Sequence, residues 1–147
     1  MSTELLSDVN VTNQKVAIVS RRKQYSDLDL SLIPHPNKKD IIPLTDIAAV
    51  KNSIKNLILT SRYERPFQPE LDSGVRSMLF ENADSMTRYM LTSRVKRIID
   101  NYEPRVNNVI VQVEDDSDNN GYNITIVFNV ITYDSQSDVR IFLERVR

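Results

Sequence analysis

Several carboxylates in the middle of this chain could supply acid–base chemistry. A glycosidase needs two such groups that face each other across a bound sugar. Spacing along the sequence does not bring any two of them together, and the chain has no tryptophan with which to line a sugar-binding groove. A charged surface accounts for most of them equally well. The candidates are Glu64, Glu70, Asp72, Glu81 and Glu103.

Metal binding and nucleophilic catalysis have few side chains available. The chain has a single histidine, His35, and no cysteine, so there is no second imidazole to share a metal and no thiolate. The segment DDSDNNG has the opening spacing of a calcium loop, with Asp116, Asp118 and Asn120 as alternate oxygen donors. Val127 stands where the closing bidentate carboxylate belongs, so a hairpin turn is the better interpretation. We therefore expect no metal site and no cofactor.

Glu103, Pro104 and Arg105 form the most distinctive cluster, in the stretch NYEPR. Proline disfavours helical dihedrals in the preceding residue, so a helix must end by Tyr102 and Glu103 must be extended. In an extended chain, residues two apart project to the same side, which lets Glu103 and Arg105 form an ion pair. A helix terminator with two solvated charges fits the same spacing.

Two helices are expected to position this cluster. The first is predicted at residues 46–60, with Thr45 or Asp46 as its N-cap. A proline-containing loop and a short helical turn at VRSMLFEN follow. The second is predicted at residues 85–102, with Ser85 as its cap. The apolar stripes are Ile47, Val50, Ile54, Leu57 and Ile58 in the first, and Leu91, Val95, Ile98 and Tyr102 in the second.

The last third of the chain alternates apolar and polar residues, as strands do. Residues 109–113 and 122–130 are predicted to form a hairpin, and DVRIFLERV to add a third strand, although a short helix also fits that last segment. Because the helices precede the strands, we predict an α+β fold with both helices on one face of a small antiparallel three-stranded sheet. The residues expected to face the core are Val109, Val111, Val113, Tyr122, Ile124, Ile126, Phe128, Val130, Val139, Ile141 and Leu143.

Length and composition predict one compact domain, because 147 residues with 40% apolar content can close a core. We place this domain at residues 45–147, after an extended arm at 1–44. Leu28, Leu30 and Leu32 recur in the arm at period two, the spacing of a segment laid along an apolar groove or of an edge strand of the chain's own core. A net charge of −1 gives no field that would gather nucleic acid, and the run VAIV is too short for a membrane span. We therefore expect neither a nucleic-acid nor a membrane partner.

Several motifs together resemble one known family. NYEPRV at a helix-to-strand transition is similar to the Glu-Pro-Arg signature of the phage baseplate wedge proteins that initiate the contractile tail sheath, a family with a counterpart in type VI secretion baseplates. YSDLDLSL, VKNSIKNLILTSR and RPFQPELDSGVRSMLFEN resemble further family segments in the family's order, over about residues 25–147. The family commonly has a glycine before RPF and another soon after Pro-Glu, where this chain has RYERPF and a later Gly74. The loop between the helices is thus where this chain departs from the family.

The resemblance implies a structural, non-enzymatic role in the virion tail baseplate, assembled in the host cytoplasm. It implies partners in the helical core bundle of the wedge and in the tail sheath, with the tail tube nearby. It also implies a C-terminal sheet like the sheath's handshake fold, which accepts strands from the first sheath ring. The alternative is a lysozyme-like cell-wall glycoside hydrolase that pairs Glu103 with an acidic residue from 64–84.

The resemblance also assigns residues to these roles. The core-bundle contact would be Glu103, Pro104 and Arg105. The sheath edge would be Val139, Arg140, Ile141, Phe142 and Leu143. The family's loop motif would be Arg65, Pro66, Phe67, Pro69 and Glu70.

Overall fold

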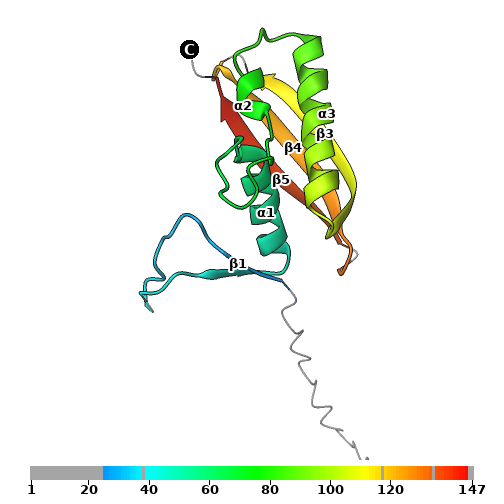
Figure 1. Ribbon diagram of the computed structural model, residues 1–147. Helices are drawn as coiled ribbons and strands as arrows, with labels where there is room; N and C mark the ends of the chain where they lie inside the picture. Colours follow the sequence, from blue (N-terminus) through cyan, green and yellow to red (C-terminus); the bar gives the residue numbers. More distant parts are fainter. Residues whose placement is uncertain (1–24, 38, 117, 134, 146–147) are drawn as a thin grey trace, which may run out of the picture.

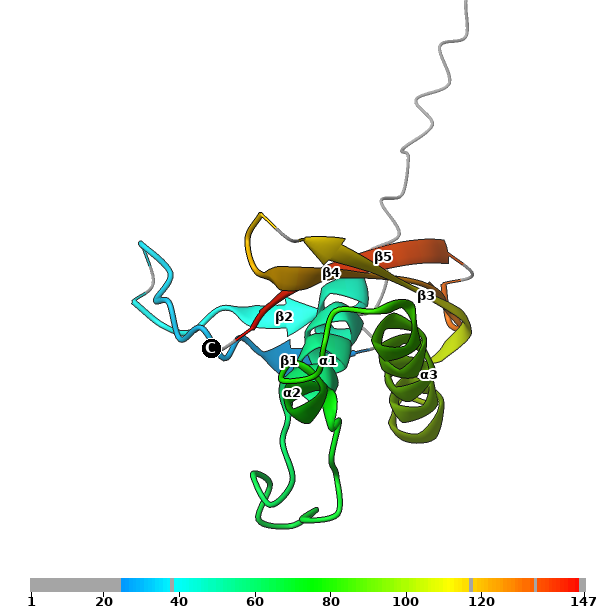
Figure 2. The same cartoon turned by 90° about the horizontal axis from the view of Figure 1, so that it is seen from above.

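Two long helices cover one face of a three-stranded antiparallel sheet, and a short third helix packs against both of them (Figures 1 and 2). The computed structural model describes residues 25–37, 39–116, 118–133 and 135–145. The sheet has the order β3-β4-β5, and a separate two-stranded sheet pairs β1 with β2. The predicted α+β class is confirmed. The elements are β1 (Ser26–Leu28), β2 (Pro43–Thr45), α1 (Ile47–Leu59), α2 (Val75–Met78), α3 (Ser85–Tyr102), β3 (Val106–Asp116), β4 (Gly121–Val130) and β5 (Ser135–Glu144).

The core lies between α1, α3 and the sheet. The two predicted helical stripes are buried along it, with two exceptions: Ile47 is half-buried, and Tyr102 is 43% exposed. It is the last residue of α3, and loop residues 67–71 rather than the sheet lie beside it. The prediction for Tyr102 is therefore wrong, and Ile99 is the buried residue of that turn.

One predicted N-cap position is confirmed, Asp46 of α1, and the other is wrong by one residue. Asp84, not Ser85, caps α3, because its carboxylate accepts a hydrogen bond from the Thr87 N–H at 2.7 Å. Asp46 occupies the N-cap position of α1 with φ 56°, but its side chain makes no capping hydrogen bond there. Its carboxylate instead accepts a hydrogen bond from the Tyr133 hydroxyl at 2.6 Å.

The alternation in the last third of the chain matches the sheet. All the predicted inward residues are buried except Val113, which is half-buried, and the third strand of the meander is confirmed as β5. The β3–β4 connection is the predicted hairpin, where Asn120 takes φ 50° and the Asp116 carboxylate accepts from the Asn119 and Asn123 amides. In β3, a register shift between Asn107 and Ile110 forms a bulge.

The N-terminal segment folds back rather than running extended. β1 ends at Leu28, a turn follows in which the Asp29 carboxylate accepts from the Ser31 N–H, and Leu32 takes φ 53°. Leu28, Leu30 and Leu32 are about half exposed or more, so the predicted extended stretch is wrong beyond Leu28. Residues 1–24 of the predicted arm lie outside the described residues, and none of the described helices has the length and apolar character to cross a membrane.

Candidate functional site

Glu103 and Arg105 form a bidentate ion pair at the corner between α3 and β3. Glu103 ends the helix, and its N–H donates to the Ile99 carbonyl at 2.9 Å. Arg105 Nε donates to Oε1 at 2.5 Å and Nη2 donates to Oε2 at 2.6 Å. The Glu103 side chain is 2% exposed and that of Arg105 29%. The corner therefore holds an ion pair between a buried carboxylate and a half-buried guanidinium, and not two solvated charges.

The surroundings keep the Glu103 carboxylate ionised. Burial acts to raise its pKa, but hydrogen bonds from Arg105 and from Ser53 of α1, together with the Arg105 charge, outweigh burial and lower the pKa. The Glu103 carboxylate in turn raises the pKa of Arg105. The general acid of a glycosidase needs the opposite, a carboxyl whose pKa is raised. Glu103 is thus unsuited to the general-acid role of the hydrolase alternative. The second, ionised carboxylate of a glycosidase must reach the sugar or a water, whereas the Glu103 side chain is buried with both oxygens bonded to Arg105.

Two other carboxylates considered for that alternative serve the loop between α1 and α2. Glu64 accepts a hydrogen bond from the Ser61 N–H at 2.7 Å. Asp72 accepts one from the Gly74 N–H at 2.8 Å and lies 3.7 Å from Arg94. Within the described residues, no group of three or more histidine, aspartate or glutamate side chains could hold a metal ion.

The Arg105 guanidinium also stacks on the N-terminal segment. It lies 5.3 Å from the centre of the Tyr25 ring, in cation–π geometry. The Tyr25 ring meets the Tyr133 ring edge-on at 6.3 Å, and the Tyr25 carbonyl accepts from the Asp46 N–H at 2.9 Å. The ion pair therefore joins α3 and β3 to the start of α1, the β4–β5 turn and the strand β1.

Sequence reasoning missed Tyr25, Asp46 and Tyr133 as members of this cluster. Tyr133 and Asp46 are separated by 87 residues, and Tyr25 and Thr132, whose hydroxyls hydrogen-bond, by 107. No local spacing signals such contacts. The sequence offered only a compositional signal: Tyr25 stands directly before β1 and Tyr133 stands in the turn between β4 and β5, and both are aromatic side chains with a polar end.

The family's loop motif lies in the projecting loop between α1 and α2, seen at the bottom of Figure 2. Backbone hydrogen bonds from Tyr63 to Pro69, from Gln68 to Arg65 and from Leu71 to Gln68 hold the loop. Phe67 is 99% exposed on it. Arg65 is half-buried, whereas Pro66, Pro69 and Glu70 are exposed. Phe67, Pro69 and Glu70 line a hollow with Tyr102, the residue directly before Glu103, so this part of the motif lies beside the end of α3.

The predicted sheath edge is the outer strand of the sheet. The Val139, Ile141 and Leu143 side chains point into the core. The Arg145 N–H donates at 2.9 Å to the carbonyl of Asn120, the residue directly before β4, so Arg145 directs its backbone groups toward β4. Because backbone direction alternates along an antiparallel strand, Ile141 and Leu143 also direct their backbone groups toward β4, whereas Arg140 and Phe142 direct theirs to the open edge.

Acid is expected to remove the stabilising contribution of Glu103. Because its pKa is lower when folded than its usual value of 4.5, the contribution is complete above about pH 4.5 and is lost as the pH falls toward the folded value. We expect the difference in the free energy of unfolding between wild type and Glu103→Gln to shrink over this window, measured by urea unfolding. Folding also lowers the pKa values of Asp29, Asp84 and Asp116. These residues are present in both proteins, so their contributions to the pH dependence cancel in the difference. A difference that stays constant down to pH 3 would contradict the assignment.

Comparison with known proteins agrees with this architecture. A family model described as baseplate wedge protein gp25 matches residues 45–135. The chain is 32% identical over 117 residues to the baseplate wedge protein gp25 of Enterobacteria phage T4, covering 80% of this chain and 86% of that protein.

Two solved structures share the fold. One is a protein named as a tail lysozyme from Geobacter sulfurreducens, with TM-score 0.61 and 19% identity over 67% of this chain and 89% of that one. The other is a chain of the anti-feeding prophage baseplate, with TM-score 0.53 and 16% identity over 84% of this chain and 87% of that one. At these identities the likeness extends to the fold alone. The family match over most of the domain, together with the phage T4 relative, shows that this chain belongs to the baseplate wedge protein gp25 family.

Proposed function

We propose that this protein, as a non-enzymatic structural component of a contractile tail baseplate wedge, templates the sheath by accepting a strand from the first sheath ring along β5. The observation that carries this proposal is the open edge of β5, where the backbone groups of Arg140 and Phe142 face away from β4. An incoming strand can pair with these groups by main-chain hydrogen bonds. In this respect the sheet would act like the handshake fold of the sheath subunit.

The edge of β5 suits strand addition better than the edge of β3. β5 pairs with β4 in one unbroken register from Ser135 to Glu144. β3 contains the bulge at Asn107–Ile110 and ends in the acidic run Glu114–Asp116, and both features discourage pairing at a free edge. An arriving strand therefore has one regular edge available in the described sheet.

We also propose that the Glu103 corner faces the helical core bundle of the wedge. Pro104 and Tyr102 are exposed on either side of the buried Glu103, so the ion pair fixes the position of two surface residues that a partner could contact. In this arrangement Glu103 and Arg105 act as positioning residues, and Pro104 forms part of the contact itself. The virion tail baseplate is the corresponding location, with assembly in the host cytoplasm and the tail tube nearby.

Proline at Arg140 tests strand addition directly. Arg140→Pro removes an outward-facing N–H without touching the β4 ladder, and edge strands tolerate proline. We expect sheath nucleation on baseplates assembled with this variant to fall by about tenfold or more, the effect of losing roughly 1.4 kcal/mol of pairing free energy. The measurement is the rate of sheath polymerisation on purified baseplates.

Arg140→Ala is the matched control, because it removes the same side chain and keeps the N–H. That side chain is 81% exposed and its contact with Asp138 is 3.6 Å long, so its loss should change little. Both variants should melt close to the wild-type temperature. If a folded Arg140→Pro protein nucleates sheath at the rate of Arg140→Ala, strand addition at β5 is wrong.

A further inference from the structure

The outward face of α3 carries apolar side chains where a solvated helix would be polar. Met86, Met90, Ser93 and Arg97 recur at intervals of four, three and four residues, which places them on one face. That face lies away from the buried one. Met86 is 62% exposed and Met90 is 52% exposed.

Two hollows lie along this helix. The first has a volume of about 260 Å³ and is lined by Met78 of α2 and by α3 residues from Tyr89 to Arg97. The second, about 310 Å³, lies at the C-terminal end, between loop residues 67–71 and Tyr102. Tyr102 falls on the helical stripe of Leu91, Val95 and Ile98, opposite the face of Met86 and Met90, so only the first hollow belongs to that face.

The charge of α3 is opposite to that of the chain. The helix carries four basic side chains against one acidic side chain, Asp100, a net of +3, whereas the whole chain has −1. The basic residues are Arg88, Arg94, Lys96 and Arg97.

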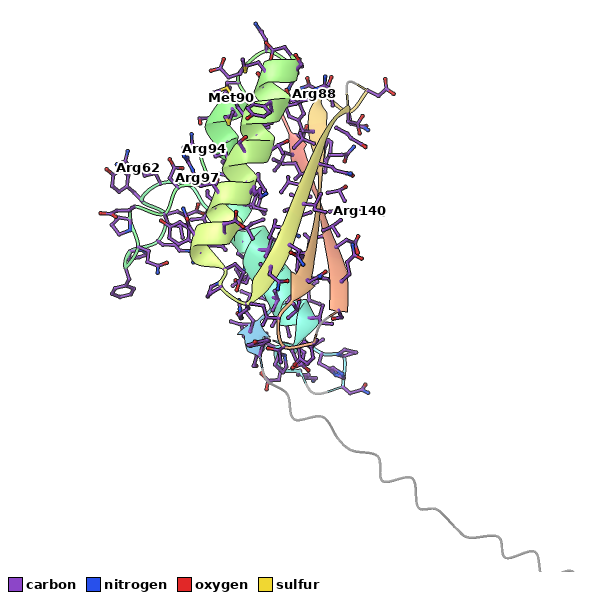
Figure 3. All side chains as sticks on the ribbon, turned by 90° about the vertical axis from the view of Figure 1, so that its right-hand side faces the viewer. Arg62, Arg88, Met90, Arg94, Arg97 and Arg140 are labelled. Carbon is purple, nitrogen blue, oxygen red and sulfur yellow. The ribbon has the colours of Figure 1, made fainter. Side chains whose placement is uncertain are left out.

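The arginines of α3 differ in the contacts that their side chains make. Arg94 contacts Asp72 and donates to the Ser73 carbonyl. Arg97 is exposed and makes no ion pair or side-chain hydrogen bond with any residue in the described part of the chain. Figure 3 shows Arg97, Arg94 and Met90 along one side of α3, with Arg62 of the loop on that same side, whereas Arg88 and Arg140 lie elsewhere.

We propose that this face of α3 is a docking surface for an acidic amphipathic helix of another baseplate protein. Apolar side chains of that helix would enter the hollow beside Met90, and its carboxylates would meet Arg97 and Arg62. Methionine, aromatic residues and arginine are the side chains enriched in protein–protein interfaces, and helices bind grooves through such spaced apolar anchors.

A phosphate backbone would use the arginines but leave Met86 and Met90 uncovered, so a protein helix fits this face better than nucleic acid. The proposal rests on the baseplate role of the family and not on strand addition at β5. The two can therefore fail separately.

Photo-crosslinking in assembled baseplates identifies the neighbour of this face. The photoreactive amino acid p-benzoylphenylalanine replaces Met90 in the full-length protein, and crosslinked peptides are read by mass spectrometry. We expect a crosslink to a segment of a different baseplate protein in which Asp and Glu outnumber Lys and Arg and apolar residues recur at helical spacing. Crosslinks only to this chain, to nucleic acid or to a basic segment overturn the proposal.

Charge reversal then tests the pairing. Arg97→Glu is expected to reduce incorporation into baseplates by at least about tenfold, because it sets like charges against each other. Arg88→Glu makes the same change on the same helix outside the hollow and should incorporate normally. Reversing one acidic residue of the crosslinked segment to arginine should restore the incorporation of Arg97→Glu. Equal incorporation of Arg97→Glu and Arg88→Glu, with both folded, excludes this surface, as does failure of the reciprocal reversal to restore it.

Discussion

Replacing Glu103 by alanine is expected to lower the free energy of unfolding by about 3–5 kcal/mol, the range for removing one partner of a buried ion pair. The loss comes from several contacts at once. Arg105 would keep its partly buried guanidinium without its carboxylate, and Ser53 of α1 would lose the acceptor that joins the two helices. Urea unfolding at neutral pH measures the effect.

A double-mutant cycle separates the pair from its surroundings. Arg105→Ala leaves a buried carboxylate unpaired, so it should also be strongly destabilised, and the double alanine variant should lose less than the sum of the single variants. Asp138→Ala is the control, because the Asp138 side chain is 53% exposed and its contacts with Arg140 and Lys51 are solvated, so its loss should cost at most about 1 kcal/mol. If Glu103→Ala and Asp138→Ala unfold alike, the corner pair adds no more than a surface pair.

Replacing Gly74 by alanine is expected to destabilise the protein by about 2–4 kcal/mol. Gly74 takes φ +57°, a left-handed conformation that costs other residues about 1–2 kcal/mol. A Cβ at this position would also overlap the Arg94 guanidinium, at 2.2 Å from Nη2, so this flexible side chain must move away, and the cost is that of the contacts it gives up. Arg94 would then lose its hydrogen bond to the carbonyl of Ser73, a residue that is 1% exposed, and an unpaired buried carbonyl costs about 1–3 kcal/mol.

Truncating Arg94 tells the two causes apart. In an Arg94→Ala background the steric part disappears, so Gly74→Ala should there cost only the backbone part, about 1–2 kcal/mol. Gly74→Asn is a second comparison, because asparagine tolerates the left-handed conformation but still carries a Cβ. Thermal melts of the wild type, Gly74→Ala, Arg94→Ala, the double variant and Gly74→Asn measure each part. If Gly74→Ala costs the same in both backgrounds, Arg94 does not hold the loop against α3.

Local spacing was sufficient to predict most of the fold. The helical stripes and the alternation of β3, β4 and β5 are regular over many residues, so their type and their buried faces follow from the sequence. The Glu103–Arg105 pair was also accessible, because proline fixes the conformation of two residues that are close in the chain. The cap of α3 was missed by one residue, since Asp84 and Ser85 are both good capping residues.

What the sequence could not supply is contact between distant segments. Tyr25 stacks under Arg105 and Arg94 lies against Gly74, and in neither case does local spacing bring the two residues together. The same holds for β5. Which residues of that strand offer backbone groups to a partner depends on its register with β4, so Arg140 and Phe142 could be told from Ile141 and Leu143 only in the structure. The spacing of Leu28, Leu30 and Leu32 led to a wrong prediction for a related reason. Apolar residues at period two indicate an extended segment only where no turn interrupts it, and here a turn follows Leu28.

The bulge in β3 makes the two edges of the sheet unequal as sites for adding a further strand. A sheet with two regular edges can add identical sheets on both sides and extend without limit, as in a fibril. Here the register shift at Asn107–Ile110 and the positive φ of Asn108 interrupt the β3 edge, so another copy of the protein cannot continue β5 into β3 as a flat, uninterrupted sheet. In the strand addition proposed above, the sheet would therefore grow at the β5 edge alone, and copies of this protein could not stack head to tail into a continuous fibril.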